Sequence, residues 1–156
     1  MVNLFRIDFR LLHFQTANVW PQKTGCNEII VANDSVVKDT MRMSLMKISA
    51  PHGIKLKICS LSQTIEYLLS EESSNKKIEL LVDSPKDAFT LTERVAYLNE
   101  INVALLKGGE GKRMVSPSLY FSEEDEMYLR KMAEKGIIME SYVACDDKKV
   151  PIDKYL

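Results

Sequence analysis

Glu28-Ile29-Ile30-Val31-Ala32 is a nearly unbroken apolar run that ends at Asn33-Asp34, and a pattern of helical period follows it as far as Ser49. Such a run is typical of a strand that is buried on both faces, as the strands of a parallel sheet are. Asp34 is a residue type that caps helices. One face of the helix would carry Val37, Met41, Leu45 and Ile48. This segment therefore predicts a buried strand followed by a helix over residues 34–49, which Pro51 and Gly53 would end.

The same alternation continues along the whole chain. Further strands are predicted over residues 4–7, 54–59, 78–82 and 101–105. Helices should begin at Ser60 or Ser62, at Pro85 and at Ser122. Strand-like pieces at 114–115 and 118–121 precede the last helix, and a final strand is predicted over 137–144. We therefore expect one α/β domain over residues 1–156, with a mostly parallel central sheet, helices on both of its faces and an antiparallel edge near the C-terminus.

Composition excludes several classes of protein. Lys and Arg number 21 and Asp and Glu 22, so the formal net charge is −1, and the basic excess that nucleic-acid binding needs is missing. No run of about 18 apolar residues is present that would span a membrane. Arg6 and Asp8 place charge where a signal peptide needs its apolar core. We expect a cytoplasmic protein that does not bind nucleic acid.

The sequence contains no clear motif for a metal site or a bound cofactor. Cys26, Cys59 and Cys145 are far apart and form no CxxC pair, so neither a zinc site nor a disulfide framework is expected. The glycine-rich stretch at 108–113 fails the P-loop pattern, because Leu106 and Arg113 stand where glycine and Ser or Thr are required. No GxGxxG follows the first strand. The sequence thus predicts neither a metal nor a bound cofactor.

Asp8, Arg10 and His13 directly follow the first predicted strand, where parallel sheets place their ligands. The simpler interpretation of His13 is a hydrogen-bonded, half-buried imidazole. The sharper one is that Arg10 offers a planar fork of donors, Asp8 holds that fork or fixes the imidazole tautomer, and the following helix presents N–H groups to an anion. Such a histidine would carry a phosphoryl group. The other histidine, His52, is predicted to be a solvated turn residue.

The stretch from Arg6 to Gln15, which reads RIDFRLLHFQ, resembles a known signature. It is similar to the R-I-D-D-R-L-I-H-G-Q-V motif of the IIB components of the mannose/fructose/sorbose family of the bacterial sugar phosphotransferase system (PTS). The resemblance continues in register through residues 33–53, 81–87, 123–125 and 147–148. The chain departs from the pattern at Phe9, where the family has a second aspartate, at Phe14, where it has glycine, and at 104–105, where it has a glycine pair.

The resemblance implies a phosphotransferase that works through a phosphohistidine. His13 would accept a phosphoryl group from a IIA partner and pass it to a sugar carried by the membrane components IIC and IID. Arg10 would contact the phosphoryl group and Asp8 would pair with Arg10. The protein would be cytoplasmic and would reach the inner face of the membrane only transiently, through its partners. The loops around Asn33, Ser84 and Lys107 would form the rim of the site.

Phe9 and Phe14 leave an alternative open. A degenerate relative would bind partners or regulate without transferring phosphate. If position 14 requires a positive φ, the loop must differ from the family's. A third interpretation is a small-ligand-binding α/β domain, since the fold permits many functions. It predicts a deep pocket, whereas a phosphocarrier should show a shallow and open histidine with apolar neighbours such as Leu12 and Phe14.

Overall fold

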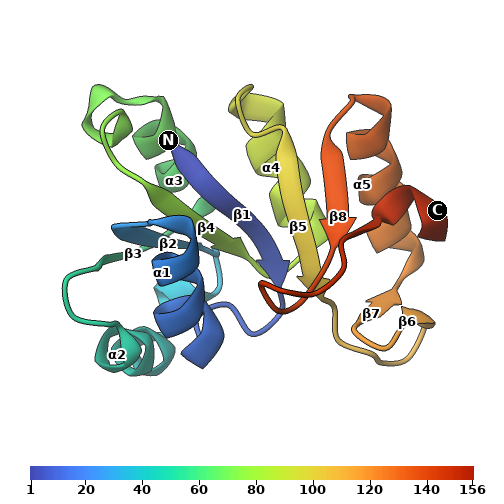
Figure 1. Ribbon diagram of the computed structural model, residues 1–156, viewed down its shortest axis with the longest axis horizontal. Helices are drawn as coiled ribbons and strands as arrows, with labels where there is room; N and C mark the ends of the chain where they lie inside the picture. Colours follow the sequence, from blue (N-terminus) through green and yellow to red (C-terminus); the bar gives the residue numbers. More distant parts are fainter.

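Seven strands form one sheet in the order β3-β2-β4-β1-β5-β8-β9, described by a computed structural model of all 156 residues (Figure 1). Their bounds are β1 Val2–Asp8, β2 Glu28–Ala32, β3 Lys55–Cys59, β4 Ile78–Val82, β5 Glu100–Leu105, β8 Ile138–Ser141 and β9 Val150–Pro151. The first six pair in parallel, and β9 runs antiparallel to β8 at the edge. The predicted mostly parallel sheet with an antiparallel C-terminal edge is confirmed, although the last long strand is shorter than residues 137–144.

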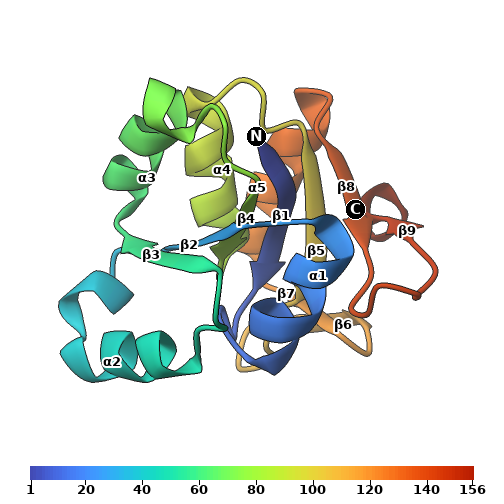
Figure 2. The same cartoon turned by 60° about the vertical axis from the view of Figure 1, so that its left-hand side comes forward.

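Helices cover both faces of the sheet (Figures 1 and 2). Their bounds are α1 Trp20–Thr24, α2 Thr40–Ser49, α3 Leu61–Leu69, α4 Pro85–Arg94 and α5 Glu123–Glu134. A π-helical turn, η1 Gln15–Val19, leads into α1. Three short 3-10 turns are η2 Val36–Lys38, η3 Glu71–Ser73 and η4 Ile152–Tyr155, and a hairpin is formed by β6 Arg113–Ser116 and β7 Leu119–Phe121. None of the helices has the length and apolar character needed to cross a bilayer.

Local signals explain where these helices begin. Ser60 and Ser122 each form a capping box with the residue three positions on, Gln63 and Asp125. Ser84 caps α4 through the N–H of Asp87, with Pro85 in the first turn. These three helix starts were predicted from the sequence and are confirmed.

The core lies on both sides of the sheet. Alternate strand residues face α3, α4 and α5 in the larger cluster, which includes Phe5, Ile7 and Leu80. The residues between them face η1, α1 and α2 in the smaller cluster, which includes Ile29 and Leu81. Because side chains alternate across a strand, Leu4, Arg6 and Asp8 of β1 all lie on the second side. Two charged residues of the central strand are thus buried beneath α1.

The prediction for residues 34–49 was wrong in its start and in its inward face. Asn33 accepts hydrogen bonds from the N–H groups of Ser35 and Val36, which favours a separate 3-10 turn, and α2 begins only after Asp39, which caps it. The displaced start rotates the helix, so that Met43 and Met46 pack inward. Asp34 instead accepts from the N–H of Leu61. The side chains expected inside are exposed at Met41, Leu45 and Ile48, to 75%, 59% and 81%.

Topology makes the carboxyl end of β1 the expected place for a ligand site. The chain leaves β1 for α1 on one face of the sheet, whereas the neighbouring strands β4 and β5 continue to α4 and α5 on the other (Figure 2). Loops that diverge in this way open a ligand site outside the carboxyl ends of the strands. Phe9 donates its N–H to the Leu105 carbonyl at 3.1 Å, so the end of β5 lies directly beside Asp8.

Candidate functional site

Asp8, Arg10 and His13 come together at the carboxyl end of β1. The Asp8 carboxylate is fully buried and accepts from the Arg10 side chain twice, from Nε at 3.1 Å and from Nη2 at 3.0 Å. Its Oδ2 atom also lies 3.0 Å from Nε2 of His13. The three predicted site residues therefore form one hydrogen-bonded group, centred on the aspartate.

A tight turn brings His13 back toward Asp8. The Leu11 N–H donates to the Asp8 carbonyl at 2.9 Å, and Leu11 itself is fully buried with a φ of 56°, a conformation that a leucine seldom adopts. Thr16 fixes the turn: its hydroxyl accepts from the His13 N–H and donates to the Leu11 carbonyl, each at 2.9 Å. Strain of this kind persists only where the surroundings impose it, and it is commonest at functional sites.

The hydrogen bond to Asp8 distinguishes the two nitrogens of the His13 ring. An ionised carboxylate only accepts, so it favours the tautomer that carries the proton on Nε2. Nδ1 makes no hydrogen bond within the protein, so its lone pair is available. The His13 side chain is 18% exposed, and it lines none of the five main surface hollows. The His13 ring is thus largely covered by the protein but keeps a solvent-exposed part.

A second arginine, Arg6, contacts the same carboxylate from below. Its Nε and Nη2 atoms lie 3.3 and 3.0 Å from Oδ2 of Asp8. Its Nη1 donates to Oδ1 of Asn102 at 2.9 Å and to the Val143 carbonyl at 3.0 Å, and its guanidinium lies over the Trp20 ring. Arg6 is fully buried, whereas the Arg10 side chain is 36% exposed.

This arrangement keeps Asp8 charged. Burial alone would raise the pKa of Asp8, but the hydrogen bonds from His13 and Arg10 and the charge of Arg6 outweigh it and hold the pKa well below its usual range. Burial lowers the pKa of Arg6, and the neighbouring Asp8 partly offsets that effect. Asp8 is therefore an anion that hydrogen-bonds to both Arg10 and His13.

The rim residues predicted from the sequence lie on the neighbouring strand ends. Asn33 donates its side-chain amide to Asp83 at 2.8 Å, which joins the ends of β2 and β4. Burial and then the Asp83 carboxylate raise the pKa of Asp87 to about 7. Lys107 follows β5, and the next residue, Gly108, packs so closely on the Tyr120 ring that a Cβ would lie 3.0 Å from it.

The two phenylalanines leave the polar group intact. Phe14 has a φ of −51°, so the position does not require the positive φ that would make phenylalanine costly. Its side chain is 73% exposed, and Phe9 is 36% exposed. Leu12 and Phe14 were both expected to supply apolar surface beside His13. Leu12 is instead buried in the smaller core cluster, so only Phe14 is exposed there. His52 is an exposed turn residue, as predicted.

Sequence reasoning gave no role to Arg6, Asn102 or Thr16. A signal for Arg6 did exist, because a charged residue two positions before Asp8 on a strand lies on the same face. Asn102 and Val143 could not be found in this way, since they reach Arg6 from β5 and from the loop after β8, 96 and 137 residues further along the chain. No three His, Cys, Asp or Glu side chains gather in an arrangement that could hold a metal ion.

Comparison with known proteins identifies the family. A family model described as "PTS system sorbose subfamily IIB component" matches residues 2–156. The chain belongs to the sorbose subfamily of PTS IIB components. The sorbose-specific EIIB component of Klebsiella pneumoniae is 25% identical over 151 residues, which cover 97% of this chain and 92% of that protein. The mannose-specific EIIAB component of Escherichia coli K12 is 29% identical over 150 residues, 96% of this chain but 46% of that longer protein.

Solved structures agree with this placement in the IIB family. The crystal structure of the IIB domain of the sorbose permease from Klebsiella pneumoniae superposes with a TM-score of 0.95 at 26% identity, covering 99% of this chain and 96% of that one. An N-acetylgalactosamine IIB component from Streptococcus pyogenes gives a TM-score of 0.91 at 26% identity, covering 99% and 97%. The chain is thus a IIB component in both sequence and fold.

Proposed function

We propose that this IIB component is a phosphocarrier. His13 accepts a phosphoryl group from a phosphohistidine of a IIA partner and passes it to a sugar handled by the membrane components IIC and IID. The observation that supports this proposal is the contact of His13 with Asp8: a buried carboxylate holds Nε2 at 3.0 Å, while Nδ1 makes no hydrogen bond within the protein. Working between these partners would bring the protein transiently to the inner face of the membrane.

The chemistry follows from this contact. The lone pair of Nδ1 attacks phosphorus, the bond between phosphorus and the donor imidazole breaks, and the bonding pair returns to the donor nitrogen. As the Nδ1 lone pair is shared with phosphorus, the His13 ring gains positive charge while its proton stays on Nε2. Asp8 stabilises that charge, as the aspartate of a Ser-His-Asp triad does. In the transfer to the sugar, a sugar hydroxyl oxygen attacks phosphorus and loses its proton to solvent, while the bond between Nδ1 and phosphorus breaks and its electron pair returns to the ring.

Arg10 supplies the charge that the phosphoryl oxygens require. Phosphoryl transfer depends mainly on in-line positioning and on cations or N–H groups for the equatorial oxygens. The Arg10 side chain is partly exposed, and all of its side-chain hydrogen bonds go to Asp8, so it can turn toward an incoming phosphoryl group. The backbone N–H groups of Leu12 and Phe14 donate to no protein acceptor and flank the histidine.

The carrier role is favoured over a purely regulatory one. Phe9 and Phe14 do not displace Asp8, Arg10 or His13 from their mutual hydrogen bonds, and the Phe14 side chain is mostly exposed to solvent. An exposed aromatic ring beside an open histidine also suits a site that two partners visit in turn. A small-ligand-binding role is less favoured, because His13 lines none of the principal surface pockets.

Incubation with a phosphorylated IIA component, followed by intact-mass spectrometry, tests the proposal. The wild type should gain one phosphoryl group that is lost in acid, and a His52→Ala control should gain it equally. His13→Ala should gain none. Phosphate on His52, or an acid-stable ester on serine, would contradict the proposal. Failure of the wild type to take phosphate from any IIA donor would favour the regulatory role.

A further inference from the structure

Two arginines contact one carboxylate, and they are held very differently. Arg6 makes four side-chain hydrogen bonds, two to Asp8, one to Asn102 and one to the Val143 carbonyl. Arg10 makes two, both to Asp8. The Arg6 side chain is fully buried, and the Arg10 side chain is 36% exposed. One guanidinium is fixed in the core, and the other is attached to the protein through Asp8 alone.

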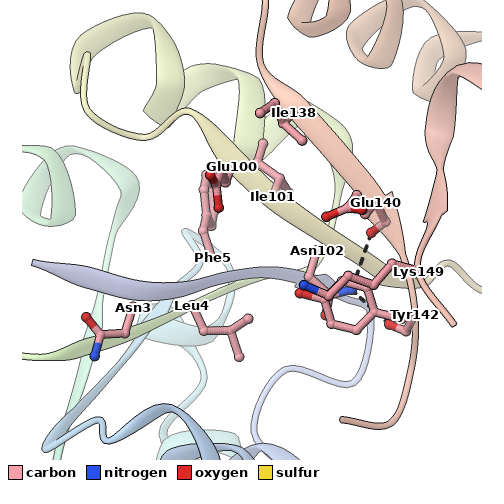
Figure 3. Close-up of a pocket in the computed structure, with 10 residues that line it drawn as sticks. All are labelled: Asn3, Leu4, Phe5, Glu100, Ile101, Asn102, Ile138, Glu140, Tyr142 and Lys149. Carbon is pink, nitrogen blue, oxygen red and sulfur yellow. Dashed lines mark hydrogen bonds between the residues drawn. The ribbon is translucent and has the colours of Figure 1, made fainter. Parts of the chain in front are cut away.

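The partners of Arg6 are themselves anchored. The Asn102 side-chain amide donates to the carbonyls of Tyr142 and Glu140 at 2.8 and 3.4 Å, which ties β5 to β8 and to the loop that follows it (Figure 3). Trp20 covers the guanidinium, with the Arg6 Cζ atom 5.3 Å from the ring centroid, and packs on Tyr142 in turn. Arg6 is therefore held by partners that are themselves fixed, and its fully buried side chain lies on the inner side of Asp8 rather than on the side open to solvent. Glu79, the other carboxylate whose charge acts on Arg6, makes no hydrogen bond to it.

The different settings of Arg6 and Arg10 matter for the charge balance around Asp8. One carboxylate faces two guanidinium groups, which leaves one positive charge in excess and favours the arrival of an anion. A phosphoryl group on His13 would attract Arg10, the exposed arginine. If Arg6 were absent, the buried Asp8 would then face the His13 ring as its only cationic neighbour, and a buried carboxylate that is poorly paired takes up a proton or moves. Either change would remove the acceptor that the Nε2–H group of His13 needs, and the ring would no longer be held in one tautomer.

We propose that Arg6 is a positioning residue that keeps Asp8 ionised and hydrogen-bonded to His13 while Arg10 turns to the phosphoryl group. Arg10 is the mobile clamp and Arg6 the permanent counterion. The first half of the proposal, that Arg6 maintains the contact between Asp8 and His13, applies to the unphosphorylated protein as well. The second half, that Arg10 turns to a phosphoryl group on His13, rests on the proposed phosphocarrier function.

The ring tautomer of His13 tests the first half without any phosphoryl donor. Nitrogen NMR of the neutral imidazole should show the Nε2–H form in the wild type. Arg6→Gln should give a mixture of the two tautomers, and Arg6→Lys, which restores the charge but not the fork, should lie between. Arg10→Gln should keep the Nε2–H form, because Arg6 still holds Asp8. Leu129→Ala, in the larger core cluster on the opposite face of the sheet, is the control for a purely structural effect and should lower stability without changing the tautomer.

Phosphoramidate, a small phosphoryl donor that needs no docking partner, tests the second half. Arg6→Gln should take phosphate about 10- to 100-fold more slowly, the range found when the groups that orient metal-ligating histidines are removed. In the wild type, phosphorylation should shift the Arg10 Nε resonance and leave that of Arg6 in place. This last measurement needs no variant, so it remains decisive even if Arg6→Gln fails to fold.

Three results would overturn the inference. They are an unchanged tautomer in Arg6→Gln, a mixed tautomer in Arg10→Gln, and an Arg6 resonance that shifts as far as that of Arg10. These results differ from those expected if the phosphocarrier proposal fails. In that case the wild type would take no phosphate, while the tautomer measurements would still report on Arg6.

Discussion

Glu79 provides a stability prediction with a calculable size. It lies on β4 with its side chain fully buried, and neither of its carboxylate oxygens has a hydrogen-bond partner. Burial raises the pKa of Glu79 from 4.5 to about 8, although the charge of Arg6 acts in the opposite direction. At pH 7 the folded protein therefore holds a proton on this residue that the unfolded chain has released.

The sign and the size follow from proton linkage. A folded-state pKa above the unfolded value means that the stabilisation is complete below about pH 4.5 and is lost as the pH rises toward 8. Within that window the free energy of unfolding should fall by about 1.4 kcal/mol per pH unit, or about 3 kcal/mol between pH 5 and pH 7. Glu79→Gln should remove this dependence, because an amide does not titrate.

Urea unfolding of both proteins at pH 5, 6, 7 and 8 measures the effect. The quantity to follow is the difference between the two free energies of unfolding, since other groups such as Asp87 titrate equally in both. The amide of Glu79→Gln also lacks partners, so its absolute stability is not informative, but the slope is. Parallel pH profiles for the two proteins would refute the reasoning and show that Glu79 is ionised or solvated in the folded state.

Three further predictions concern the site. Asp8→Asn should lower the free energy of unfolding by about 3–5 kcal/mol, because it leaves the buried Arg6 without its counterion, and it should abolish transfer; a stability loss below about 1 kcal/mol in urea melts would contradict this. Arg10→Lys keeps the charge but loses the fork, so transfer from phosphoramidate should slow while the thermal midpoint stays near that of the wild type; an unchanged rate would exclude Arg10 from the site. Phe14→Gly should change the free energy of unfolding by no more than about 1 kcal/mol, the backbone effect of glycine, since the ring is 73% exposed; a loss of 2 kcal/mol or more would show that the ring packs in solution.

Local signals in the sequence were sufficient for most of the fold. Strand alternation, helix caps and turn residues act within a few positions, so the strands and the helix starts at Ser60, Pro85 and Ser122 could be predicted. The inward face of α2 could not, because it depends on the 3-10 turn that Asn33 stabilises and that delays the helix to Thr40.

In the candidate site, too, some features could be predicted from nearby residues and others depend on the assembled fold. Asp8, Arg10 and His13 are close in sequence and recognisable by type. The left-handed conformation of Leu11 could not be predicted, because leucine has no preference for it. The second arginine was visible as a charge on the first strand, but its distant partners Asn102 and Val143 depend on the assembled sheet.

The position of the phosphoryl group on the His13 ring is the decisive observation for the proposed chemistry. In that chemistry Asp8 holds the Nε2 proton, so Nδ1 is the nucleophile. Phosphorylation by a IIA partner, followed by phosphorus and nitrogen NMR of the intact protein, distinguishes the two nitrogens. We predict a phosphoryl group on Nδ1 of His13, with a proton retained on Nε2. A phosphoryl group on Nε2, or on any residue other than His13, would contradict the account.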